Sequence, residues 1–174
     1  MGALAFWKAV VQDDSNFLER VTSLLRDNGF SYCVIGGVGV NAYAVPVLTE
    51  DLDIIVAIGQ LPAARVLLER EFKVSEFEHT LNVYDPGSKL QVQIRKNPAL
   101  TEMIARAEPH TVLDLERPVA APADLIRLKI AAAMEPTRGP SKRGKDTRFR
   151  DLEQEVPAEL VERVEAVTDP EETE

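Results

Sequence analysis

Apolar residues recur with two different periods along this 174-residue chain. Between Asp13 and Asn28 they return every three or four positions, with Phe17, Val21 and Leu25 on one side, which is typical of an amphipathic helix. Other apolar runs are short and bounded by turn-forming residues, which favours strands. Helices are predicted over 13–28, 38–44, 62–72, 98–107 and 122–134, and strands over 30–35, 52–58, 80–84, 89–95, 110–115 and 117–120.

The order of these elements predicts an α/β sandwich of the α+β kind, in which helices flank a mixed β-sheet. Two further helices are predicted over 145–154 and 157–167, so the C-terminal part is helical. We divide the chain into a core over residues 1–120, a helical C-terminal part of the same domain over 121–168, and an acidic disordered tail over 169–174.

Composition excludes several classes of protein. No apolar run reaches the roughly 20 residues that cross a bilayer, and residues 1–11 are too short for a secretion signal. We therefore expect a cytoplasmic protein with no membrane partner. A single cysteine, Cys33, excludes an internal disulfide and a cysteine-based zinc site. Cys33 is predicted to be a core residue, and His79 and His110 are predicted to be structural.

Charge is unevenly distributed. The formal net charge is −9, but residues 153–174 alone carry nine acids and one base, which leaves the rest of the chain nearly neutral. Just before them, residues 138–150 hold six bases and one acid, Asp146. This basic segment is either a solvated loop or a site for a triphosphate or an RNA backbone. We expect the acidic tail to shield it, so that deleting residues 169–174 strengthens nucleotide or RNA binding at low salt.

A double glycine and a pair of acids mark the candidate site. Gly36 and Gly37 end a predicted strand and open a short helix, where glycine lets backbone N–H groups approach an anion closely. Asp51 and Asp53 open the next strand, and residues two apart in a strand face the same side. Two converging carboxylates repel each other unless a cation lies between them. Mg²⁺ is typically bound by one or two carboxylates and substrate phosphates.

Two other interpretations of this segment compete with a metal and phosphate site. In the first, Asp51 caps a turn, Asp53 is solvated and the glycines only form a tight bend. The joint occurrence of the double glycine and the acid pair, at the start of an otherwise apolar strand, favours a functional site over this interpretation. In the second, Gly37, Gly39 and Ala42 match a loose dinucleotide fingerprint. That fingerprint requires an acid about 20 residues further on, at the end of a strand, whereas these acids stand nearer, at a strand's beginning.

The segments from Val34 to Gly37 and from Asp51 to Ile54 resemble the signature of the polymerase-beta-type nucleotidyltransferase superfamily. Ala42 and Thr49 resemble its abortive-infection-type (AbiEii-like) branch. The resemblance implies a minimal nucleotidyltransferase fold in which the two acids bind Mg²⁺. It further implies transfer of a nucleoside monophosphate from an NTP to an acceptor hydroxyl. An RNA or protein acceptor, and an antitoxin or other adjacent-gene partner, are compatible with that branch.

The pattern departs from the superfamily at its third carboxylate. That acid would align with Gln93 in the predicted strand 89–95, and a neutral amide can ligate a metal weakly but cannot act as a base. Asp85, in the preceding turn, is poorly placed to replace it. Gln93 is retained as a candidate catalytic position. The alternative is a catalytically degenerate member that binds a nucleotide or a protein partner.

A second resemblance lies downstream. Asp124 and Leu125 open a predicted helix and Lys129 follows one turn later, like the lysine that approaches nucleotide phosphates in that branch. A solvated lysine beside an apolar face is the alternative for Lys129. Lys145, Asp146 and Asp151 resemble another motif of the branch. With Gly36, Gly37 and Lys129, they complete the nucleotide-binding set that the resemblance implies.

Overall fold

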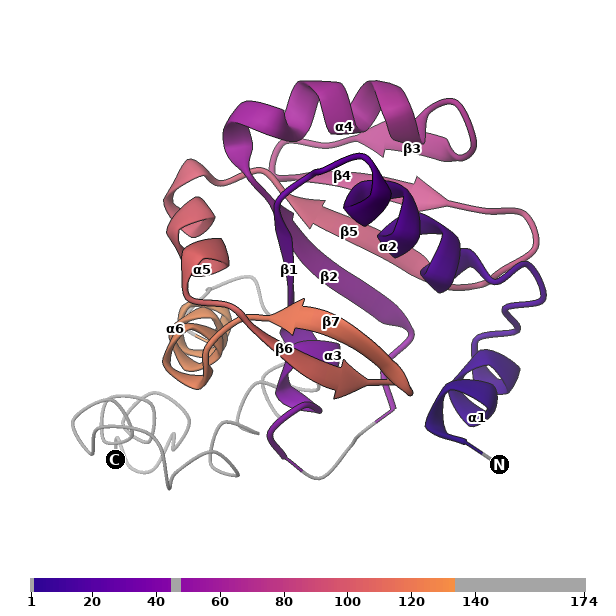
Figure 1. The fold of residues 1–174 in the computed structure, drawn as a ribbon, viewed down its shortest axis with the longest axis horizontal. Coiled ribbons are helices and arrows are strands. Elements are labelled where there is room, and N and C mark those ends of the chain that lie inside the picture. Colours follow the sequence, from indigo (N-terminus) through magenta and orange to yellow (C-terminus); the bar gives the residue numbers. More distant parts are fainter. Residues whose placement is uncertain (1, 45–47, 134–174) are drawn as a thin grey trace, which may run out of the picture.

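The computed structural model describes residues 2–44 and 48–133. The described residues form one seven-stranded sheet in the order β3-β4-β5-β2-β1-β7-β6 (Figure 1). The strands are β1 (Tyr32–Ile35), β2 (Asp51–Val56), β3 (Lys73–Glu76), β4 (Thr80–Tyr84), β5 (Gln91–Arg95), β6 (Glu108–Val112) and β7 (Leu115–Val119). β2 runs parallel to β5 and β1 runs parallel to β7, while the other neighbouring pairs are antiparallel. The predicted mixed sheet is confirmed.

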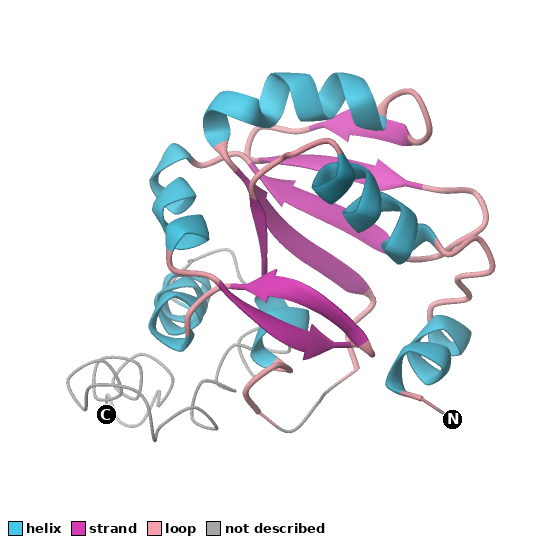
Figure 2. Cartoon of the chain, viewed as in Figure 1, coloured by secondary structure: helices cyan, strands magenta, loops and turns pink. Residues whose placement is uncertain are grey.

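Helices flank this sheet (Figure 2). They are α1 (Ala3–Val10), α2 (Phe17–Asp27), α3 (Gly36–Val40), α4 (Leu61–Leu68), α5 (Thr101–Ala105) and α6 (Pro122–Ala133), with 3₁₀ turns η1 (Ile58–Gln60) and η2 (Pro98–Leu100). In the view of Figure 1, α2 lies in front of the sheet, α4 runs along the top beside β3, and α5 and α6 lie at the left. The α+β class is confirmed.

Strand periodicity decides where the core lies. In β2, Leu52 and Ile54 are fully buried, while Asp51 and Asp53 are partly exposed. The neighbouring strands repeat the pattern, because Val92 and Ile94 of β5 are also fully buried. Since residues two apart share a face, one face of these strands is apolar core and the other carries the polar side chains. The main core is built from that apolar face together with Phe17, Leu18, Val21, Leu25, Ala64 and Leu68 of α2 and α4.

Two elements were not predicted from the sequence. α1 lies in the mildly apolar N-terminal residues, and β3 lies in a segment of mixed character between the predicted helix over 62–72 and the predicted strand over 80–84. The predicted helix over 38–44 is shifted, because α3 begins at Gly36 and ends at Val40. The predicted helix over 98–107 is divided into η2 and α5.

The β6–β7 hairpin is also shifted from the two predicted extended segments. Leu113 and Asp114 form its turn with φ of 50° and 57°, so the chain reverses two residues earlier than the pattern indicated. The predicted helices over 145–154 and 157–167, the basic segment and the acidic tail lie outside the described residues. Within the described part, no helix is long and apolar enough to cross a membrane.

Candidate active site

The double glycine forms a tight junction between β1 and α3. Gly36 has φ of +65°, a conformation that glycine adopts at little cost. A Cβ atom at this position would lie 2.5 Å from Oδ2 and 2.9 Å from Cβ of Asp53. Gly36 is therefore required both by its backbone angle and by the side chain that packs against it. This contact brings the glycine turn and the second acid of the predicted pair into one site.

Asp51 and Asp53 lie on the same face of β2, as predicted from their spacing. In the sheet register, Asp53 is paired with Ile35 on β1 and with Gln93 on β5. Its carboxylate Oδ1 accepts a hydrogen bond from Nη2 of Arg95 at 3.2 Å. The Asp53 side chain is 17% exposed and that of Arg95 is 41% exposed, so this ion pair is reached by solvent.

Gln93 lies directly beside Asp53, where the superfamily's third carboxylate was expected to align. Its Nε2 donates to Oε1 of Gln91 at 3.4 Å, and Nε2 of Gln91 donates to Oη of Tyr84 at 2.9 Å. Asn82 adds a donor to the same hydroxyl at 3.3 Å. The polar face thus continues from the two carboxylates across β5 and β4 as a ladder of amides and one phenol.

A pocket of about 880 Å³ opens beside Asp53. It brings together Gly36, Gly37, Asp53 and Lys129, which the sequence assigned to one site from three separate segments. Asp51 and Gln93 are not among its lining residues. Lys145, Asp146 and Asp151 lie outside the described residues.

Four charged or titratable residues of this pocket were not predicted as site residues from the sequence: Arg95, Lys96, Glu78 and His79. Arg95 was detectable, because it follows Gln93 by two positions and so shares its face. Nζ of Lys96 forms an ion pair with Oε1 of Glu76 at 2.9 Å. His79, which was interpreted as structural, is 82% exposed at the pocket and belongs to its wall.

Helix α6 is fixed to the core through Asp124. This carboxylate is 1% exposed and accepts two hydrogen bonds of 2.9 Å from Arg106, which follows α5, and one of 3.3 Å from Arg127. A buried carboxylate is stable only when its charge is compensated in this way. The acid of the Asp-Leu pair therefore anchors the helix that presents Lys129 to the pocket.

Cys33 and His110 do not line this pocket. Cys33 is fully buried in β1, and burial raises the pKa of its thiol to about 12, which leaves it protonated and unreactive near neutral pH. His110 packs edge-on against Tyr43 with ring centroids 4.6 Å apart. The burial of Cys33 confirms its predicted core position.

The donor set at β2 suits a hard divalent cation. Two carboxylates on one strand face, an adjacent amide oxygen at Gln93 and the space left by Gly36 match the ligands of Mg²⁺ when substrate phosphates complete its shell. The guanidinium of Arg95 on Asp53 shows that a positive charge is accommodated there. No group of three or more His, Cys, Asp or Glu side chains that could hold a metal occurs among the residues described.

The fold is similar to that of several solved nucleotidyltransferase structures. The antibiotic-resistance factor ANT(2'')-Ia superposes with a TM-score of 0.60 at 12% identity, covering 88% of each chain. The lincosamide antibiotic adenylyltransferase LnuA, in a lincomycin-bound structure, has a TM-score of 0.57 at 12% identity, covering 83% of this chain and 99% of its own. An antigenic nucleotidyltransferase-like protein from Paracoccidioides brasiliensis has a TM-score of 0.53 at 16% identity, covering 92% and 84%.

At 12–16% identity, these likenesses show that the fold is shared. No protein-family model matches the sequence, and no curated protein matches it.

Proposed function

We propose that this protein is a Mg²⁺-dependent nucleotidyltransferase that moves a nucleoside monophosphate from an NTP to an acceptor hydroxyl. The observation that carries the proposal is the packing of Asp53 against Gly36 in a pocket that also contains Lys129. Paired carboxylates, a glycine turn and a lysine are the groups that a metal-bound triphosphate requires.

Asp51 and Asp53 would hold the metal, which stabilises negative charge on the phosphates when bound. The glycine turn lets the triphosphate approach the backbone closely, and Lys129 compensates its charge. The acceptor oxygen then forms a bond to the α-phosphorus while the bond from that phosphorus to the bridging oxygen breaks. Pyrophosphate leaves and the acceptor proton passes to solvent, because Gln93 cannot take it.

The acceptor is best sought first among small hydroxylated molecules. ANT(2'')-Ia has been captured with adenylyl-2''-tobramycin and LnuA with lincomycin. RNA and protein hydroxyls, which the AbiEii-like resemblance implies, form the second group to test. An antitoxin or other adjacent-gene partner belongs to that same branch of the proposal.

The test is transfer of label from α-³²P-labelled NTPs in the presence of Mg²⁺ to tobramycin, lincomycin, total RNA or cell protein. Calorimetry with α,β-methylene ATP measures binding separately from transfer. Asp51→Asn and Asp53→Asn each should abolish transfer and weaken Mg²⁺-dependent nucleotide binding by at least about tenfold, since each removes a charged ligand. Unchanged nucleotide affinity in both variants would refute the metal site.

A second candidate function rests on Gln93. If the amide has replaced a required acid, the protein binds a nucleotide or a protein partner without transferring the nucleotide. Nucleotide binding without label transfer to any acceptor, together with transfer gained in Gln93→Asp, would favour this function. Transfer by the wild-type protein would dismiss it.

A further inference from the structure

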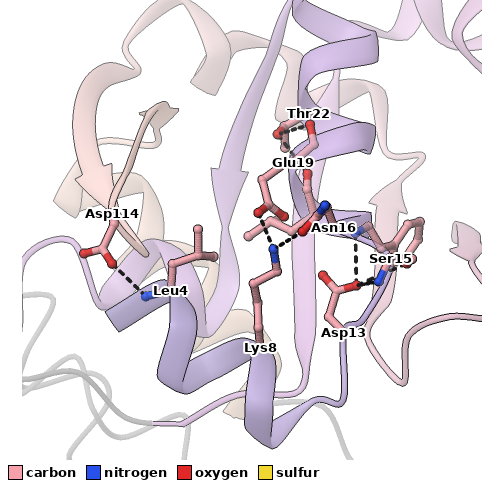
Figure 3. Close-up of polar contacts among 10 residues, drawn as sticks. Leu4, Lys8, Asp13, Ser15, Asn16, Glu19, Thr22 and Asp114 are labelled. Atoms are coloured by element: carbon pink, nitrogen blue, oxygen red, sulfur yellow. Dashed lines mark hydrogen bonds and ion pairs between the residues drawn. The ribbon is translucent and has the colours of Figure 1, made fainter. Parts of the chain in front are cut away.

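Helix α1, which the sequence did not predict, is held by contacts to three separate parts of the molecule, two of which are shown in Figure 3. The backbone N–H of Leu4 donates to Oδ2 of Asp114 in the β6–β7 turn at 2.9 Å. Nζ of Lys8 donates to Oε1 of Glu19 on α2 at 2.5 Å. At the end of the helix, the carbonyl of Val11 accepts from the N–H of Lys89 at 3.0 Å. The helix therefore holds a defined position against the body of the protein.

The side chain of Trp7 links α1 to the candidate site. Trp7, the single tryptophan of the chain, is 3% exposed, and its indole Nε1 donates to the backbone carbonyl of Thr49 at 2.7 Å. An indole N–H is a donor only and usually finds a partner when it is buried. The partner here lies two residues before Asp51, at the entry to β2.

Thr49 in turn contacts both halves of the candidate site. Its Oγ1 donates to the backbone carbonyl of Asp51 at 3.2 Å. On its other side, a Cβ atom at Gly37 would lie 3.4 Å from both Cβ and Oγ1 of Thr49. Thr49 thus lies between the glycine turn and the first carboxylate, and the indole of Trp7 fixes its carbonyl.

We propose that Trp7 is a positioning residue for the metal and nucleotide site. It holds the backbone of Thr49 so that Asp51 enters β2 in the orientation that pairs it with Asp53 beside the glycine turn. Ligands held in place before binding cost less to order when the ligand arrives, so loss of this anchor weakens binding. The inference rests on the proposed function, because it needs the two carboxylates to bind a divalent cation.

The test uses Trp7→Phe, which keeps most of the apolar packing and removes the donor. Mn²⁺ binding is measured by the electron paramagnetic resonance of the free ion, with and without α,β-methylene ATP. We expect the dissociation constant for Mn²⁺ to rise about fivefold, as for the loss of one hydrogen bond. Lys8→Met is the matched control, because it also removes a polar anchor of α1 but one that contacts α2 rather than the site.

A purely structural tryptophan would predict a different result. In that case Trp7→Phe and Lys8→Met lower the midpoint of thermal unfolding and leave Mn²⁺ affinity at the wild-type value, which would overturn the inference. Thr49→Val adds a double-mutant cycle, since it removes the Oγ1 bond to Asp51 but keeps the carbonyl that Trp7 binds. Because the two residues act in series, the double variant should lose less affinity than the two single losses combined; additive losses would contradict coupling through Thr49.

Asp53→Asn separates this inference from the proposed function. If wild-type protein binds Mn²⁺ and Asp53→Asn does not, the carboxylate site stands, and the behaviour of Trp7→Phe alone decides the role of the tryptophan. If wild-type protein binds no Mn²⁺ even with nucleotide, the proposed function and this inference both fail.

Discussion

The two faces of strands β4, β5 and β2 differ in chemistry although they are built from the same strands. One face is buried under α2 and α4 and carries aliphatic side chains: Leu81, Val83, Val92, Ile94, Leu52 and Ile54. The other carries Asn82, Tyr84, Gln91, Gln93, Asp51 and Asp53. Since neighbouring residues alternate between faces, each site residue is held in the chain between core residues. The packing of one face thus fixes the geometry of the other.

The largest expected effect is on the buried face. Leu81→Ala should lower the free energy of unfolding by about 2–5 kcal/mol, because it removes a buried aliphatic side chain and leaves a cavity. Urea denaturation measures the loss. Mn²⁺ affinity of the folded variant should stay at the wild-type value. A variant that loses metal affinity while it remains folded would show that the two faces are not separable.

Cys33 marks where the polar face ends. It lies on the same side of β1 as Ile35, which pairs with Asp53, yet it is fully buried. Burial raises the pKa of its thiol from 9.0 to about 12, so the folded protein retains this proton more tightly than the unfolded chain does. The resulting stability is complete below pH 9.0 and is lost as the pH rises toward 12, by about 3 kcal/mol at pH 11.

Urea denaturation of the wild-type protein and Cys33→Ala from pH 8 to pH 11 isolates this contribution. The wild-type protein should lose more stability than the variant over that range, since alanine has no proton to release. Equal losses would mean that the thiol is reached by solvent and that the polar face extends into β1.

A smaller effect, on Mn²⁺ affinity, is expected at Gln93, where the polar face carries an amide instead of an acid. Gln93→Asp places a third carboxylate beside Asp53 and should lower the Mn²⁺ dissociation constant by about tenfold, since a charged ligand replaces a neutral one. Gln93→Asn is the control, because asparagine has nearly the same shape as aspartate but carries no charge. Equal affinities of the Asp and Asn variants, measured by Mn²⁺ titration, would place the metal away from β5.

The smallest change in the free energy of unfolding is expected for Asn82→Ala, although Asn82 is the chain neighbour of Leu81. Asn82 is 8% exposed, and its Oδ1 has no hydrogen-bond partner among the described residues. Asn82→Ala should therefore change the free energy of unfolding by less than about 1 kcal/mol in either direction, because the lost bond to Tyr84 is offset by removal of an unpaired buried acceptor. Urea denaturation beside Leu81→Ala gives the contrast directly. A loss as large as that of Leu81→Ala would contradict the distinction between the faces.

The elements that could be predicted from the sequence are those whose local residue pattern matches their place in the folded protein. Strand β2 and the shared face of Asp51 and Asp53 follow from a period of two, and the turn at Gly36 follows from residue type. The contact between Gly36 and Asp53 was not predictable in detail, because it depends on the pairing of β1 with β2. The motif nevertheless indicated that the two segments belong to one site.

Elements stabilised mainly by distant partners were missed. α1 has a weak pattern of its own, and Trp7, Lys8 and Leu4 are fixed by contacts with Thr49, Glu19 and Asp114. β3 has no buried residue and is held by its pairing with β4. Arg95 was visible on the strand face, but its ion pair with Asp53 needs the parallel register of β2 and β5.

The position of β1 between β2 and β7 has a consequence for biosynthesis. β2 follows β1 closely in the chain, whereas β7 is reached only at residues 115–119, where Val119 pairs with Val34. At about 5–20 residues per second, a ribosome needs about 4–17 seconds to travel from one partner to the other. During that interval one edge of an entirely apolar strand has no native partner, and such edges readily pair with other chains. The nascent chain is therefore most open to aggregation between synthesis of the candidate site's strands and synthesis of the hairpin that completes the sheet.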